Sequence, residues 1–201
     1  TDLKEWTYVG NFLKHDMSDV AIGEDISCPN FFQLGDKWIL LCISHPFGCR
    51  YYIGEWDTEN EQFVPETHGR MNWRRPEQSI YDTVYRDFFA PESILTSDGR
   101  RVMWAWLHAL HDDIKYRTCQ SLPRELSLDD DGNLRMRPLR ELENLRYDPI
   151  VLQDINVIPP DAPHSNFAIQ HIIDLNGDAF EIQLTIKQSE VRRKRFGLQL
   201  F

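Results

Sequence analysis

The sequence predicts an all-β protein, and two observations carry that prediction. Apolar runs are short, rich in β-branched and aromatic residues, and separated by Gly, Asp, Asn and Pro. Turn sequences that tolerate a positive φ recur between the runs, at "LGDK" (34–37), "SDGR" (97–100), "DDG" (130–132) and "LNGD" (175–178). A strand every roughly 8 to 14 residues is typical of an antiparallel meander, which closes as a barrel, a sandwich or a propeller.

The strands are expected at residues 28–33, 37–44, 49–56, 62–64, 88–95, 101–107, 115–119, 125–128, 133–136, 168–175, 179–187 and 195–201. In "DKWILLCISH" (36–45), apolar residues occupy both alternating positions, as in a strand that is buried on both faces. An inner or middle strand of a propeller blade fits this pattern.

One shift in composition predicts a domain boundary. Residues 142–166, "LENLRYDPIVLQDINVIPPDAPHSN", lack periodicity and carry four prolines. The sequence that follows alternates as a hairpin does. We therefore expect one domain at 1–148, a linker at 149–166, and the beginning of a second β domain at 167–201. Both ends of the chain are expected to be cut from a longer protein.

Composition excludes some partners. The net charge of −10 argues against binding to nucleic acid, whose phosphates would be repelled. An apolar run near the length of a membrane span is absent from the sequence, so no membrane contact is expected. The chain starts without a signal peptide, which leaves a secreted and a cytoplasmic location equally open.

The four cysteines, Cys28, Cys42, Cys49 and Cys119, lack the spacing of a zinc site. Cys28 and Cys42 lie within apolar strands and are expected to be small buried hydrophobic residues. A Cys42–Cys49 disulfide stays open as an alternative in an oxidising compartment. The sequence neighbours of His45, His68, His108 and His111 differ, and no metal is expected. His108 and His111 are interpreted as ordinary loop histidines or as the rim of a site, and residues 68–73 as a connection between two blades that contributes to the same rim.

Three segments, in order, resemble glycoside hydrolase family 32, the β-fructosidases. "SCPNFFQLGDKWILLCISH" (27–45) is similar to the family's Glu-Cys-Pro segment and the hairpin after it. "RDFFAPESILTSDGRRVMWAWL" (86–107) resembles its Asp-Phe-Tyr-Ala segment and tryptophan strand. The most specific match is "SLPRELSLDDDGNLRMRPLRELENLR" (121–146), which resembles the stretch that closes the propeller.

The resemblance implies part of a five-bladed β-propeller followed by the start of a β-sandwich. It implies cleavage of β-fructofuranosides such as sucrose, levan or inulin, with retention of configuration, by two carboxyl groups and without a cofactor. Two alternatives stay open: a non-catalytic carbohydrate-binding propeller, and an arabinanase- or xylosidase-type propeller enzyme.

The sequence departs from the family in two places. The acid/base glutamate that precedes Cys-Pro in the family is replaced here by Ser27, which cannot protonate a leaving group. Glu24 and Asp25 are the candidates to replace it: strand alternation places Asp25 on the face of Ser27, and Glu24 has the longer reach. A solvated turn is the alternative for both. The family's Asn-Asp-Pro nucleophile motif is absent, so the nucleophile is expected in a preceding part of the protein.

Candidate substrate-binding residues are Arg86, Asp87, Glu92, Trp104 and Trp106. The resemblance places the first three beside the sugar, with Asp87 bound to a hydroxyl; a surface ion pair of Arg86 with Asp87 is the alternative. Trp104 and Trp106 alternate on one strand and face one side. They are interpreted either as a stacking surface for a furanose ring or as packing between blades.

Overall fold

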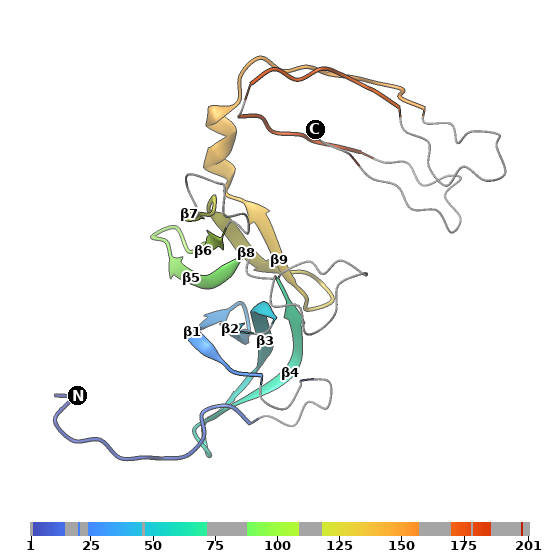
Figure 1. Cartoon of the computed structure of the whole chain (residues 1–201). Coiled ribbons are helices and arrows are strands. Elements are labelled where there is room, and N and C mark those ends of the chain that lie inside the picture. Colours follow the sequence, from blue (N-terminus) through green and yellow to red (C-terminus); the bar gives the residue numbers. More distant parts are fainter. Residues whose placement is uncertain are drawn as a thin grey trace. The chain divides into compact units, whose positions relative to one another are not determined.

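The computed structural model describes residues 2–14, 20, 24–45, 47–71, 88–108, 118–156, 170–177, 179–185 and 198 (Figure 1). The chain divides into two compact units, residues 1–142 and 143–201. All strands of the described residues lie in the first unit, in two antiparallel sheets. Within the described residues, no helix has the length and apolar character needed to cross a membrane.

The first sheet, sheet A, is a four-stranded meander in the order β1-β2-β3-β4. Its strands are β1 (Ser27–Leu34), β2 (Lys37–Ser44), β3 (Gly48–Asp57) and β4 (Gln62–Arg70). The predicted "LGDK" hairpin joins β1 to β2, with Leu34 opposite Lys37. Gly35 adopts a φ of +64° in this two-residue turn, a conformation that residues with a side chain rarely adopt.

The second sheet, sheet B, contains β5 (Phe89–Leu95), β6 (Arg101–His108), β8 (Arg124–Leu128) and β9 (Leu134–Pro138) in that order. The short strand β7 (Thr118–Gln120) also pairs with β6. The predicted turns at 97–100 and 130–132 connect β5 to β6 and β8 to β9. A 3-10 helix, η1 (Arg140–Leu145), follows β9.

Strand β2 is buried on both faces, as its sequence predicts. Its residues from Ile39 to Ile43 are all nearly or fully buried. Ile39, Leu41 and Ile43 pack into one core cluster, whereas Leu40 and Cys42 pack into a second cluster on the other face. Sheet A is therefore a layer with apolar side chains on both sides.

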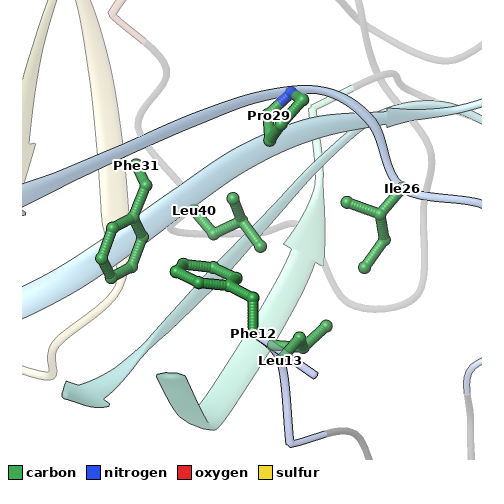
Figure 2. A pocket seen from close by; sticks show the side chains of 6 residues that line it. All are labelled: Phe12, Leu13, Ile26, Pro29, Phe31 and Leu40. Carbon is green, nitrogen blue, oxygen red and sulfur yellow. The ribbon is translucent and has the colours of Figure 1, made fainter. Parts of the chain in front are cut away.

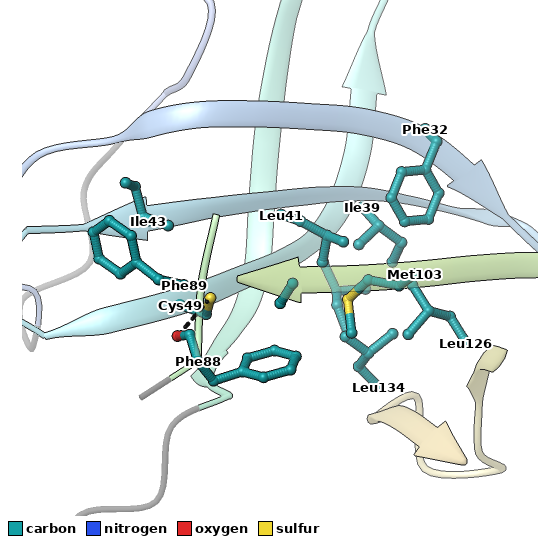
Figure 3. Close-up of a cluster of buried hydrophobic side chains, with 12 residues drawn as sticks. Phe32, Ile39, Leu41, Ile43, Cys49, Phe88, Phe89, Met103, Leu126 and Leu134 are labelled. Atoms are coloured by element: carbon teal, nitrogen blue, oxygen red, sulfur yellow. Dashed lines mark hydrogen bonds between the residues drawn. The ribbon is translucent and has the colours of Figure 1, made fainter. Parts of the chain in front are cut away.

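The larger core cluster joins the two sheets (Figure 3). Leu41 and Ile43 of sheet A pack in it with Met103 and Leu126 of sheet B. Polar contacts reinforce the junction: the Cys49 thiol donates a hydrogen bond of 3.1 Å to the carbonyl of Phe88. The Arg101 guanidinium lies 3.9 Å from the ring centre of Phe32, and burial lowers the pKa of Arg101.

The second cluster covers the other face of sheet A with aromatic rings. Phe31 stacks on Trp38 with centroids 4.7 Å apart and meets Phe63 edge to face. The N-terminal segment closes one side of this cluster, because Phe12 and Lys14 exchange backbone hydrogen bonds with Phe63 on β4. Phe12 adds its ring to the group.

The cysteines differ in part from the prediction. Cys28 is exposed, so the expectation of burial was wrong: a bulge in β1 gives Cys28 a φ of +49° and breaks the alternation there. Cys42 and Cys49 are buried, and burial raises the pKa of Cys42 to about 12. Cys42 and Cys49 belong to clusters on opposite faces of sheet A, which rules out the alternative of a disulfide between them.

Three predictions about strands differ from the structure, are not confirmed by it, or fall on residues that it does not describe. The strand predicted at 62–64 continues to Arg70, so His68 lies within β4 rather than in a loop between blades. Residues 170–177 and 179–185 are not assigned to strands, so the predicted start of a β-sandwich is not confirmed. The strand expected at 195–201 lies outside the described residues, apart from residue 198.

Replacing Leu41 by alanine is expected to destabilise the whole protein by about 2–5 kcal/mol, because the fully buried side chain fills the junction between the sheets. Urea denaturation measures the loss. Leu95→Ala is the matched control, since Leu95 is mostly exposed on β5 and its truncation leaves no cavity. Equal losses in the two variants would contradict this account of the core.

Candidate active site

The two carboxylates ahead of β1 point to opposite faces of sheet A. Glu24 contacts Arg50 of β3. Arg50 stands opposite Cys42 of β2, whose side chain belongs to the second, aromatic cluster. Asp25 contacts His45, whose ring meets Phe89 in the core between the sheets. Successive residues of an extended chain alternate in this way, so the two neighbours occupy different environments.

Glu24 forms a buried ion pair. Its side chain is 1% exposed, and its Oε1 lies 2.6 Å from Nη2 of Arg50, which is 2% exposed. The two charged groups are in contact as an ion pair, but the geometry at Oε1 is not that of a hydrogen bond. Oε2 accepts a hydrogen bond of 3.5 Å from Arg70, which stands opposite Arg50 across β3 and β4. One carboxylate thus contacts two adjacent arginines.

The two arginines that contact Glu24, Arg50 and Arg70, also contact rings. Nη1 of Arg50 lies 2.9 Å from Nδ1 of His68, and the guanidinium of Arg70 lies 4.3 Å from the ring centre of Phe47. Removing one member of a buried pair leaves an uncompensated charge. These contacts assign Glu24 and Arg50 a structural task, whatever else Glu24 does.

Asp25 accepts three hydrogen bonds. Oδ1 receives the backbone N–H of His45 at 2.8 Å, and Oδ2 lies 2.6 Å from both the Ser27 hydroxyl and Nδ1 of His45. Desolvation raises the pKa of Asp25, but the bonds from Ser27 and His45 outweigh it and lower the pKa to about 2. At neutral pH, Asp25 is therefore an ionised acceptor without a proton to give.

Rings from both sheets line up beside Asp25. The His45 imidazole lies 5.9 Å from the ring of Phe89, and Phe89 meets Trp106 edge to face at 6.0 Å. His45 is 55% exposed in its side chain, and Trp106 is 40% exposed. The structure therefore brings the predicted residues Asp25 and Trp106 to one surface at the junction of the sheets.

The other predicted residues are only partly accounted for. Trp104 is half-buried, and its neighbours Met103 and Ala105 pack in the core, so Trp104 and Trp106 share the other face of β6. Glu92 is exposed on β5, opposite Trp104. Arg86 and Asp87 lie outside the described residues.

A separate pocket of about 430 Å³ lies on the aromatic side of sheet A (Figure 2). Its lining is Phe12, Leu13, Ile26, Pro29, Phe31 and Leu40. Sugar hydroxyls need hydrogen-bonding partners, and none of these side chains supplies one. This pocket is thus not a suitable sugar site. Within the part of the chain that the structure describes, no three His, Cys, Asp or Glu side chains are grouped as metal ligands.

Sequence reasoning did not single out Arg50, and it considered His45 only as one of four histidines for which no metal was expected. Arg50 stands in an otherwise apolar strand. Because a buried arginine needs a counter-charge, its place in this strand is a signal that an acidic residue elsewhere in the chain pairs with it. His45 follows directly on β2, and Ser27 pairs with Ile43 two residues before it. The "LGDK" turn alone would set Ser27 opposite Ser44. The bulge in β1 shifts the pairing by one residue, and this shift places His45 beside Asp25.

The family model described as "Glycosyl hydrolases family 32 N-terminal domain" matches residues 1–138. This match covers both sheets and every candidate site residue.

Curated relatives extend the likeness. The chain is 31% identical over 202 residues to a sucrose-6-phosphate hydrolase of Vibrio alginolyticus, which covers 92% of this chain and 38% of that protein. It is 26% identical over 208 residues to a raffinose invertase of Escherichia coli, with 92% and 40% covered. The chain thus spans about two fifths of the length of these relatives.

A solved structure agrees in fold. A sucrose-6-phosphate hydrolase from Lactobacillus gasseri superposes with a TM-score of 0.51 at 20% identity. The superposition covers 73% of this chain and 31% of that one.

Replacing Glu24 by glutamine is expected to destabilise the protein by about 3–5 kcal/mol, because it leaves the buried Arg50 without a counter-charge. Glu55→Gln is the matched control: its contact to Lys37 is also 2.6 Å but is solvent-exposed, so its loss should cost far less. Urea denaturation compares them. A similar small change in both variants would show that Glu24 is not part of a buried pair.

The Asp25 contacts should appear in the dependence of stability on pH. Folding lowers the pKa of Asp25 from 3.8 to about 2. The contribution of Asp25 to the free energy of unfolding is therefore complete above pH 3.8 and is lost as the pH falls to about 2. The difference in unfolding free energy between wild type and Asp25→Asn should therefore shrink as the pH falls from about 4 to 2. A difference that is constant over this range would contradict the assignment.

Proposed function

Because the chain belongs to glycosyl hydrolase family 32, we propose that the intact protein is a glycosidase that cleaves β-fructofuranosidic bonds. The family match over residues 1–138 is the observation that carries this proposal. The names of the relatives, a raffinose invertase and sucrose-6-phosphate hydrolases, favour a sucrose-type carbohydrate as substrate.

The proposed architecture is that of a five-bladed propeller of which this chain forms the C-terminal part. Sheets A and B would be two of its blades, within residues 1–148. Residues 149–166 would be the linker and residues 167–201 the beginning of a β-sandwich. The antiparallel four-strand meander of sheet A supports the proposal, because such a meander is the unit of a propeller blade.

The proposed reaction is a double displacement with retention, in which a carboxylate nucleophile attacks the anomeric carbon while an acid protonates the leaving oxygen. We place the nucleophile in a part of the protein that precedes this chain. The sugar would lie against the exposed parts of Asp25 and Trp106, with Trp106, which packs on the buried ring of Phe89, as a stacking partner. Glu92, Arg86 and Asp87 stay candidates for contacts with hydroxyl groups.

The surroundings of the two carboxylates bear on which of them is the acid. Glu24 is buried against Arg50 and has almost no surface that a glycosidic oxygen could reach. Asp25 is accessible, but its low pKa leaves it ionised. The same observations favour a second candidate function, a carbohydrate-binding propeller without catalysis, because Ser27 occupies the place of the family's acid.

The intact protein is expected to hydrolyse sucrose, levan or inulin with release of β-fructofuranose as the first product. Release of reducing sugar measures the activity, and proton NMR of the first product measures retention. A full-length protein that binds these sugars without cleaving them would instead establish the binding module. Glu24→Gln and Asp25→Asn belong in the same assay: if neither lowers the rate by at least about a hundredfold, neither carboxylate is the acid.

A further inference from the structure

We propose that the imidazole of His45, oriented by Asp25, is the proton donor to the glycosidic oxygen. This inference deepens the proposed function and rests on it. It assigns the acid to a side chain on the same surface as Trp106, and it gives Asp25 a positioning role rather than that of the acid.

The hydrogen bonds of Asp25 determine which nitrogen of His45 is available. An ionised carboxylate only accepts hydrogen bonds. At 2.6 Å from Asp25 Oδ2, Nδ1 of His45 must therefore carry a proton and donate it to this bond. The second nitrogen, Nε2, then remains as the one that can hold or release a proton toward a ligand. A carboxylate that fixes the other nitrogen of a histidine in this way is a recurrent device for orienting an acid or base.

The ring has little freedom to turn away from this orientation. Asp25 holds both the backbone N–H of His45, through Oδ1, and its ring, through Oδ2. The Ser27 hydroxyl donates a further hydrogen bond of 2.6 Å to the same Oδ2. Glu24, the residue next to Asp25, is anchored to Arg50 in the buried pair. The dyad of His45 and Asp25 is thus attached to β1, β2 and β3.

The surroundings of His45 suit a bound sugar. Its side chain is 55% exposed, so a ligand can reach it without rearrangement of the core. The buried ring of Phe89 packs between His45 and the partly exposed Trp106 of sheet B. An exposed aromatic ring near a polar donor is the usual composition of a site that positions a polar ring.

The proton balance of the step is complete. The imidazolium of His45 gives its Nε2 proton to the glycosidic oxygen as the bond from the anomeric carbon to that oxygen breaks, and the oxygen keeps the electron pair. The carboxylate nucleophile of the proposed mechanism forms the new bond to the anomeric carbon. The neutral Nε2 then accepts a proton from the water that displaces this carboxylate, which restores the imidazolium. Asp25 stays ionised throughout.

The test compares leaving groups in the full-length protein. His45→Ala is expected to lower kcat/KM on sucrose by about a hundredfold or more, the usual range for a positioned acid. On 4-nitrophenyl β-D-fructofuranoside the loss should be several-fold at most, since nitrophenolate leaves without a proton. Asp25→Asn should show the same contrast to a smaller degree, because it acts through His45.

His171→Ala is the matched control. His171 is also exposed and lies 3.3 Å from an aspartate, Asp174, but belongs to the other compact unit, so its removal should leave both rates unchanged. Equal losses on the two substrates in His45→Ala, or no loss on sucrose, would overturn the role of His45 while the proposed function stands. A wild-type protein that cleaves neither substrate would overturn the proposed function and the inference together.

Discussion

The buried ion pair between Glu24 and Arg50 determines how the segment before β1 lies on the sheet. Arg50 belongs to the third strand of sheet A and is almost inaccessible to water, so its charge needs a partner inside the protein. Glu24 supplies that partner and also faces Arg70. Once Glu24 turns to one face of the sheet, Asp25 turns to the other, where it meets His45. The chemistry of the candidate site follows from this division.

The junction of the two sheets supplies the other half of the site. Strand β2 carries apolar side chains on both faces, so it serves the core of sheet A and the core shared with sheet B. Phe89 takes part in that shared core and also touches His45 and Trp106. The surface offered to a ligand is therefore built on packed side chains of two sheets rather than on a loop alone, which favours a rigid site.

The two neighbouring carboxylates, Glu24 and Asp25, differ in chemical behaviour because their surroundings differ. Glu24 is buried against guanidinium groups. Asp25 accepts hydrogen bonds from Ser27 and His45, and 37% of its side chain is exposed. Ser27, which lacks an ionisable group itself, contributes by holding Asp25 in place.

The sequence by itself determined the all-β class, the hairpins at 34–37, 97–100 and 130–132, and the double burial of β2, because turn residues and apolar periodicity act locally. It also determined the family, from segments that keep their order along the chain. The exposure of Cys28, the extension of β4 to Arg70 and the partners of Glu24 and Asp25 were decided only by the tertiary structure. These features depend on a bulge and on contacts between residues some 20 to 46 positions apart, which no local pattern encodes.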